Sequence, residues 1–288
     1  MWRTVIKGSE GSVISMIKIV ADSTVYLKKQ EADLLGVQVV PIPYTVGDLG
    51  YQETYSDRNG SFESLLRSNE TFTTSQPNVE AFLSAFEEEL SRGSEVLCVT
   101  ISSRLSGTYS AAYMAARQTG SEKIAVFDSR LTAGGIYLLV CEARRLADEG
   151  ETLGNIVERL TRIREGITIA FSVDDMTPLQ RSGRIGFVRM SVRTILNQKP
   201  ILLCRDGAVV SDSMARGHSE ILRKLAEKVP PEAKNAVVNY IENSRTASDL
   251  YHVIQKKYPA LPIKLQKMGP VLGIHLGLRV VAVSFLTD

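Results

Sequence analysis

Short apolar segments alternate with longer amphipathic segments through the first 165 residues of this chain. The apolar segments have the length and composition of strands buried on both faces, and they are residues 17–21, 37–43, 96–101 and 124–127. The amphipathic segments carry apolar side chains at helical spacing, and they are residues 77–91, 107–118, 132–149 and 152–164. Parallel strands need such crossover helices between them. The sequence therefore predicts an α/β domain over residues 17–165, with a mostly parallel sheet and helices on both of its faces.

The second half of the chain, residues 166–288, contains a different pattern. Two apolar runs flank Asp206-Gly207, which is typical of the tight turn of a β-hairpin. Further strands are predicted at 167–173, 236–241 and 280–285, and helices at 176–179, 218–228 and 246–257. Because a hairpin pairs its strands antiparallel, we expect a second α/β domain with a mixed sheet. Residues 1–16 are interpreted as a disordered extension or a non-native start, and they are left out of this prediction.

The composition limits the functional classes. The formal net charge of this 288-residue chain is only +2, so no nucleic-acid partner is expected. No apolar run reaches the roughly 18 residues of a membrane-spanning helix, and no signal peptide is recognisable. We therefore expect a cytoplasmic protein with at most transient membrane contact. Cys98, Cys141 and Cys204 form no CxxC pair, so reduced buried thiols are expected rather than a metal site or a disulfide.

The first candidate binding segment is rich in hydroxyl groups and precedes a predicted helix. Residues 73–77 (TTSQP) place Thr74 or Ser75 at the N-cap position, with Pro77 in the first turn. A helix start exposes backbone N–H groups and the positive end of the helix dipole, which favour an anion. The alternative is that these side chains are ordinary helix caps.

The second candidate segment follows a buried strand and opens the next helix. Residues 101–109 (ISSRLSGTY) include Ser103, Ser106 and Gly107. One side chain is enough to cap a helix, so this density of hydroxyl groups exceeds what capping requires. In an open parallel sheet, loops at the carboxyl ends of neighbouring strands share one edge, where ligands bind. Hydroxyl groups without a fixed charge suit a carboxylate better than a doubly charged phosphate.

Two further segments carry candidate residues. In residues 181–186 (RSGRIG), Arg181 and Arg184 supply positive charge next to glycines that allow a tight backbone, although a solvated turn would have the same composition. His275 is a polar side chain within the apolar, glycine-rich residues 269–277, where a structural histidine is the alternative. Nucleophile-elbow, phosphate-loop, zinc-protease and dinucleotide motifs are absent from the sequence, so no catalytic residue, metal or cofactor is predicted.

These motifs together resemble the DegV family, the fatty-acid-binding subunit of bacterial fatty acid kinase. The resemblance covers residues 17–275, and its motifs occur in the family's order. They are VADS (20–23), TSQP (74–77), ISSRLSGTY (101–109), FDS (127–129), SGRI (182–185), KPIL (199–202) followed by DG (206–207), and GPVLGIH (269–275).

The resemblance implies two α/β domains that bury a long-chain fatty acid such as palmitate, stearate or oleate. It implies that the carboxylate contacts hydroxyl groups at Thr74, Ser75 and Ser106, with an arginine (Arg184 or Arg181) and His275 in the same polar network. It also implies a separate ATP-dependent kinase subunit that phosphorylates the carboxylate for phospholipid synthesis, so the chain itself would be a non-catalytic binding subunit.

The chain departs from the family pattern after His275. The family usually continues with Thr-Gly-Pro-Gly, whereas residues 276–279 are Leu-Gly-Leu-Arg here. Two other functions stay open at this point. One is a serine hydrolase that uses Ser106 with His275, and the other is a carrier of a different small lipid carboxylate.

Overall fold

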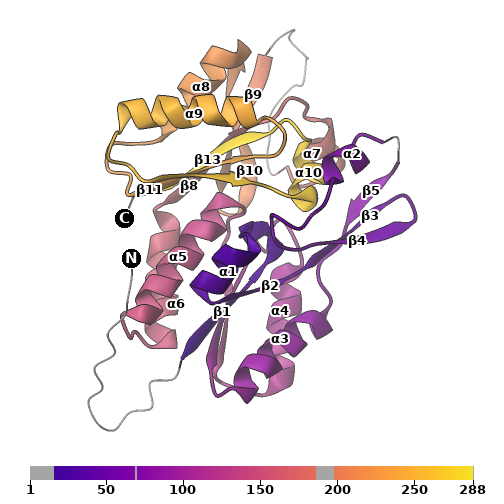
Figure 1. Cartoon of the computed structure of the whole chain (residues 1–288), viewed down its shortest axis with the longest axis vertical. Helices are drawn as coiled ribbons and strands as arrows, with labels where there is room; N and C mark the ends of the chain where they lie inside the picture. Colours follow the sequence, from indigo (N-terminus) through magenta and orange to yellow (C-terminus); the bar gives the residue numbers. More distant parts are fainter. Residues whose placement is uncertain (1–15, 69, 186–197, 288) are drawn as a thin grey trace.

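The computed structural model describes residues 16–68, 70–185 and 198–287, and it confirms a two-domain α/β fold (Figure 1). The N-terminal domain contains a four-stranded sheet in the order β2-β1-β6-β7, and all its pairs are parallel. Its strands are β1 (Ile17–Asp22), β2 (Val37–Val40), β6 (Glu95–Thr100) and β7 (Ile124–Asp128). Most side chains of β1 and β6 are buried on both faces, as the apolar runs predict.

Helices cover both faces of this sheet. One face packs against α3 (Val79–Ser91) and α4 (Thr108–Thr119), and the other against α5 (Gly134–Asp148) and α6 (Leu153–Glu165). The short α1 (Lys29–Leu35) and the 3₁₀ turn η1 (Ser23–Val25) connect β1 to β2. Apolar spacing predicted the four long helices to within a few residues, whereas α1, with two turns and a mostly polar sequence, was not predicted.

Residues 37–74 differ from the prediction. The apolar run 37–43 was predicted as one strand, but it belongs to two, β2 and β3 (Ile42–Val46). Strand β3 pairs antiparallel with both β4 (Leu49–Glu53) and β5 (Phe72–Thr74). These three strands form a separate sheet. Pro41 lies between the two strands, so the run contains a break that hydrophobicity alone does not reveal. The short α2 (Phe62–Leu65) lies between β4 and β5.

The C-terminal domain has a six-stranded mixed sheet in the order β10-β9-β8-β13-β11-β12. Its strands are β8 (Ile167–Ser172), β9 (Gln198–Arg205), β10 (Ala208–Arg216), β11 (Asn235–Tyr240), β12 (Ile263–Lys267) and β13 (Val281–Leu286). The predicted hairpin is β9 and β10, which pair antiparallel around Asp206 and Gly207. Both turn residues have positive φ (49° and 80°), as expected for a tight hairpin turn.

The outer face of this sheet is covered by α8 (Gly217–Lys228) and α9 (Ser244–Lys257) (Figure 1). Two short helices, α7 (Thr177–Arg181) and α10 (Pro270–Leu276), lie next to the other face. The sequence predicted α7, α8 and α9, but it predicted neither α10 nor β12.

Helix α5 lies between the two sheets, and it contacts β1 of the first sheet and β8, β11 and β13 of the second (Figure 1). One continuous apolar core therefore joins both domains. A buried polar link reinforces it, because the backbone N–H of Gly134 donates to Asn239 Oδ1 and the Asn239 amide donates to Gln266. Gln266 in turn donates to the backbone of η1 and the residue after it.

The predicted domain limit after residue 165 falls between α6 and β8, and it stays a prediction. The interpretation of residues 1–16 lies outside the described residues, apart from Met16. No helix in the described part of the chain is long and apolar enough to cross a membrane.

Candidate functional site

A cavity of about 350 Å³ lies between the two domains. The loops that follow β6 and β7 form one side, at the carboxyl ends of the parallel strands, where ligands bind in open α/β sheets. Strands β8, β9, β10 and β13 and helices α7 and α10 form the other side. The site therefore needs both domains, since neither half of the chain encloses it alone.

The cavity wall is mostly apolar, and its polar groups come from a few segments. The apolar lining consists of Ile42, Ile101, Leu105, Ala133, Ile169, Phe171, Leu179, Cys204, Val209, Met268, Val271, Leu272, Leu276, Val280 and Ala282. The remaining lining residues are Thr74, Ser75, Gln76, Ser106, Gly107, Thr132, Arg184 and His275. An apolar wall with a few polar groups is typical of a pocket that holds an apolar ligand with one polar end.

Thr74 and His275 form the central polar pair of this cavity. Thr74 ends β5, and His275 lies in the last turn of α10, two hundred residues later. Thr74 Oγ1 lies 2.7 Å from His275 Nε2, which is a hydrogen bond between the two domains. The second ring nitrogen, Nδ1, is buried without a hydrogen-bond partner among the described residues. Both residues were predicted as site residues, and the fold brings them together.

Burial, and to a lesser extent the neighbouring positive charge of Arg184, lowers the pKa of His275 to about 4. The imidazole is therefore neutral at physiological pH. Arg184 lines the cavity, and its guanidinium donates to the carbonyl oxygens of Ser182 and Leu105 at 2.5 and 3.4 Å. These bonds hold a permanent positive charge beside the polar side of the cavity.

The serine-rich loop after β6 divides its hydroxyl groups between structure and cavity. Ser106 lines the cavity, where its hydroxyl lies 2.8 Å from Thr108 Oγ1 and accepts from the Thr108 backbone N–H at 3.3 Å. Ser102 is fully buried and donates to the carbonyl of Gly207 at 2.8 Å, which fastens the loop to the hairpin of the other domain. The excess of hydroxyl groups over capping needs is thus partly structural.

Two predicted site residues lie away from the cavity. Ser103 is exposed, and its hydroxyl donates to Asp128 Oδ2 at 2.5 Å. Arg181 is exposed at the end of α7 and is not among the cavity-lining residues. Of the two arginines that the sequence left open, the structure places Arg184 at the cavity. Ser75 and Gly107 both line it.

The predicted cap of α3 is wrong. Thr74 and Ser75 precede the helix by several residues, and the N-cap is Asn78, whose side chain accepts from the backbone N–H of Ala81 at 2.9 Å. Asparagine is among the strongest N-cap residues, so it sets the helix start in place of the hydroxyl groups. The dipole of α3 therefore does not start at Thr74, whereas α4 and α5 begin beside the cavity, with their N-cap residues Gly107 and Ala133 in its wall.

Thr132 and Ala133 line the cavity but were not singled out from the sequence. The hydroxyl of Thr132 is buried without a hydrogen-bond partner among the described residues. Ala133 has φ 47° and ψ −124°, a conformation that an alanine rarely adopts. A usable signal was present, because Gly134-Gly135 directly follow and open a helix at the same sheet edge as the serine-rich loop.

Glu53 fixes the start of α10, the helix that carries His275. Its carboxyl group is fully buried and accepts from the backbone N–H of Val271 at 2.9 Å and from the hydroxyl of Ser23 at 2.8 Å. Burial raises the pKa of Glu53 to about 8.

Gly277 follows α10 and has φ 78°, a backbone conformation that favours glycine. The family pattern also has a glycine at this position, so this part of the pattern is kept for a conformational reason.

The geometry argues against the hydrolase alternative, in which Ser106 would act as a nucleophile with His275 as its base. The hydrogen bonds of both Ser106 and His275 go to threonines, Thr108 and Thr74 respectively, rather than to each other. A serine nucleophile needs its base within hydrogen-bond reach. Among the described residues, no cluster of His, Cys, Asp and Glu side chains could hold a metal ion.

Comparison with known proteins identifies one family that matches nearly the whole chain. The profile of the family described as "Uncharacterised protein, DegV family" matches residues 16–288. A DegV domain-containing protein of Halalkalibacterium halodurans is 30% identical over 282 residues, which cover 96% of this chain and 100% of that protein.

Two solved structures share the whole fold. A DegV family protein from Thermus thermophilus, described by its fatty acid binding, is 29% identical with a TM-score of 0.83, covering 95% of this chain and 100% of that one. The Streptococcus pneumoniae Fatty Acid Kinase B3 protein, loaded with linoleic acid, is 21% identical with a TM-score of 0.81 and the same coverage. At that identity the second likeness shows the fold alone.

Proposed function

Since the chain belongs to the DegV family, we propose that it binds a long-chain fatty acid in the interdomain cavity and presents its carboxyl group to a partner kinase. The observation that carries the proposal is the hydrogen-bonded pair of Thr74 and His275 in an otherwise apolar cavity that Ser106 also lines. The ligand class is that of palmitate, stearate or oleate, and the Thermus thermophilus relative described by its fatty acid binding supports it.

The apolar wall supplies most of the affinity. Each methylene group removed from water contributes about 0.8 kcal/mol, so a long acyl chain binds tightly without any polar contact. The apolar surface that would contact the acyl chain includes the buried side chains of Leu179, Phe171 and Leu272. The polar groups then need only to orient the carboxylate and to compensate for its lost hydration.

A neutral His275 determines how Thr74 can act. When Nε2 carries the imidazole proton, it donates to Thr74 Oγ1, and the threonine hydroxyl is then free to donate to the carboxylate. Ser106 is arranged in a similar way when the Thr108 hydroxyl donates to it, because its oxygen then accepts from Thr108 and its own proton is available. Both hydroxyl groups therefore become donors toward an anion, and Arg184 adds positive charge beside them.

Catalysis is assigned to the partner. An ATP-dependent kinase subunit would phosphorylate the presented carboxylate, and the acyl phosphate would enter phospholipid synthesis. The ordered family motifs support this part, and the likeness to the Fatty Acid Kinase B3 protein supports the shared fold on which it depends. A cytoplasmic location belongs to the same proposal.

Binding is tested first. Lipid extracted from the purified protein is identified by mass spectrometry, and the delipidated protein is titrated with oleate. Thr74→Val and Ser106→Ala should each weaken binding about tenfold or more, because each removes a hydrogen bond to a charged group. The matched controls are Thr73→Val, whose hydroxyl lies 2.7 Å from Thr45 Oγ1, and Ser103→Ala. Equal losses in variants and controls, or no bound fatty acid at all, would refute the proposal.

Presentation is tested separately. The loaded protein is mixed with ATP and the fatty acid kinase subunit of the same organism, and acyl phosphate is trapped with hydroxylamine. We expect product only when both proteins are present. Product formed by this chain alone would overturn the assignment of catalysis to the partner, and tight binding without product would leave only the fatty-acid carrier function.

A further inference from the structure

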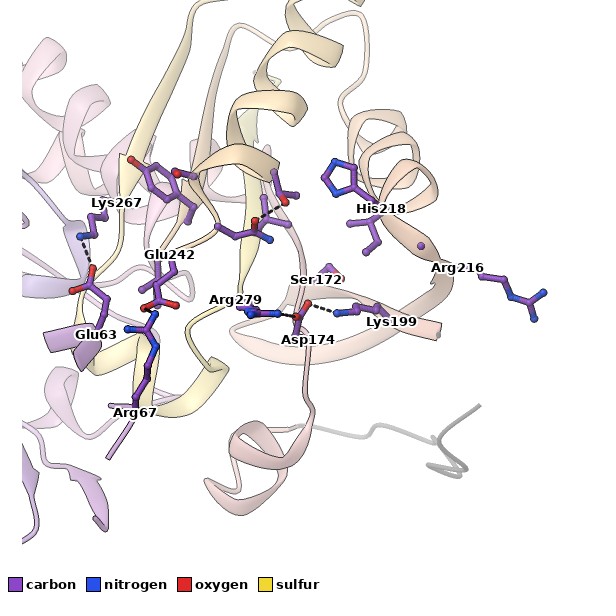
Figure 2. Close-up of a pocket in the computed structure, with 18 residues that line it drawn as sticks. Glu63, Arg67, Ser172, Asp174, Lys199, Arg216, His218, Glu242, Lys267 and Arg279 are labelled. Atoms are coloured by element: carbon purple, nitrogen blue, oxygen red, sulfur yellow. Dashed lines mark hydrogen bonds and ion pairs between the residues drawn. The ribbon is translucent and has the colours of Figure 1, made fainter. Parts of the chain in front are cut away.

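A second, larger cleft of about 1360 Å³ lies on the opposite side of the C-terminal sheet, and in the described residues it shares no lining residue with the interdomain cavity. Strands β8, β10, β11 and β12 run in one direction, as their pairings require, so their carboxyl ends meet at one sheet edge. The cleft lies at this edge (Figure 2). In open α/β sheets such an edge is where ligands bind.

Two helices begin at this cleft. Strand β10 leads directly into α8 at Gly217, and β11 leads into α9 at Ser244 after a short turn. At neither helix does the N-cap side chain accept a hydrogen bond from the first turn, and at α8 the Glu220 carboxylate accepts one from the N-cap N–H of Arg216 at 2.6 Å. Asn243, at the N-cap position of α9, instead accepts a hydrogen bond from the Thr246 hydroxyl at 2.6 Å. Both helix starts thus direct first-turn N–H groups and the positive ends of their dipoles toward the cleft.

A buried hydroxyl group without a partner gives an independent indication of a ligand. Ser172, the last residue of β8, is 3% exposed and lines the cleft, and its hydroxyl has no hydrogen-bond partner among the described residues. Its neighbour Phe171 lines the interdomain cavity, because successive side chains of a strand point to opposite faces. A buried hydroxyl without a partner is unfavourable, and a hydrogen-bonding ligand in the cleft would remove that penalty.

The charges around this hydroxyl favour an anion. Asp174 forms ion pairs with both Lys199 and Arg279, so one carboxylate stands between two cations beside Ser172 (Figure 2). The other two carboxylates of the lining each have a cation of their own, in the pairs Arg67–Glu242 and Lys267–Glu63. Arg216 adds a further cation at the rim. The cleft therefore has more cations than carboxylates, in addition to the two helix dipoles.

We propose that this cleft binds a phosphate dianion, either free or as a soluble monoester, which contacts the Ser172 hydroxyl and the first turns of α8 and α9. Lys199 and Arg279 share the one carboxylate of Asp174 and so leave one balancing positive charge, and Arg216 at the rim supplies another. A phosphate group carries a charge of about −2 and several strong acceptor oxygens, which match this combination of cations and N–H donors. The site does not depend on fatty acid binding.

The test is titration calorimetry of the full chain with inorganic phosphate and with glycerol 3-phosphate, and with acetate as the carboxylate control. We expect saturable binding of at least one phosphate ligand, weakening as salt is added, and no comparable binding of acetate. The two phosphate titrations distinguish a free ion from a monoester.

Two variants with matched controls locate the site. Ser172→Ala should weaken phosphate binding about tenfold or more, because a hydrogen bond to a charged group is lost. Its control is Ser284→Ala, which removes another buried, unpartnered hydroxyl from the same sheet but away from the cleft. Arg279→Ala is the second variant, since its side chain is 73% exposed and its loss should not impair folding. Arg162→Ala, at 75% exposure on α6, is its control.

Arg279→Ala should weaken binding several-fold and reduce its salt dependence, while both controls bind as the wild type does. Absence of saturable binding by both phosphate ligands would overturn the proposal. So would acetate that binds as well as phosphate, or Ser172→Ala and Arg279→Ala proteins with wild-type affinity.

Discussion

Replacement of His275 by glutamine should change how the stability of the protein depends on pH. The unfolded chain protonates a histidine near pH 6.5, whereas burial lowers the pKa of His275 in the folded protein to about 4. The folded state therefore binds fewer protons between these values. The stability that comes from the neutral imidazole is fully present above pH 6.5, and it is lost as the pH falls toward 4.

The expected size of this loss follows from linkage. At about pH 5 the unfolded histidine is mostly charged while the folded one is mostly neutral, which lowers the free energy of unfolding by about 2 kcal/mol. His275→Gln does not titrate, and its side chain can still form a hydrogen bond with Thr74. From about pH 7.5 to about pH 5, the variant should therefore lose about 2 kcal/mol less stability than the wild type.

The assay is urea denaturation followed by circular dichroism on delipidated protein, since bound ligand would add its own stabilisation. His252→Gln removes an exposed imidazole from α9 and serves as the control. If the wild type and His275→Gln lose the same stability between the two pH values, burial does not depress the His275 pKa. The neutral donor role assigned to this residue would then be untenable.

Three further outcomes are expected. Ala133→Gly should raise the free energy of unfolding by about 1 kcal/mol, because glycine adopts φ 47° without strain; an unchanged or lower urea midpoint would contradict this. Gly134→Ala should lower it by about 2 kcal/mol, because an added Cβ would overlap Asn239 Oδ1 and lie 2.7 Å from Ser284 Oγ; wild-type thermal stability would show that the contact relaxes freely. The stability contributed by protonated Glu53 is present below its unfolded pKa near 4.5 and is lost as the pH rises through its folded value of about 8. Glu53→Gln should therefore lose about 3 kcal/mol less stability than the wild type between about pH 6 and pH 9 in denaturation experiments, and parallel pH profiles would rule out that ionisation.

Strong local periodicity explains what was predictable in the fold. Strands such as β1 and β6 and helices such as α5 bury a regular set of side chains, so their positions can be inferred from apolar spacing. The small sheet of β3, β4 and β5 could not be inferred in this way. The side chains of this sheet are only partly buried, and its strands are short. Tyr44 also pairs with Thr74, thirty residues later in the sequence, which no local pattern indicates.

The candidate site was likewise predictable only in part. Ser106 and Gly107 follow a predicted strand and open a predicted helix, so their position at the sheet edge could be inferred from physical principles. The contact between Thr74 and His275 could not, because it joins β5 and α10, two elements that no local pattern indicated. The ordered family motifs identified that pair, whereas they also included Ser103, which the fold uses to hold Asp128.

The packing of α5 between the two sheets determines how a ligand can enter and leave the cavity. Opening the domains like a hinge would expose Leu138 on α5 together with Ile169 and Val237 on the second sheet, all buried in the shared core. Each such exposure costs roughly 1.5–3 kcal/mol, and the polar link from Gly134 to Asn239 would break as well. We therefore expect a ligand bound in this cavity to exchange through local movement of the short helices α7 and α10, while the two sheets remain in contact.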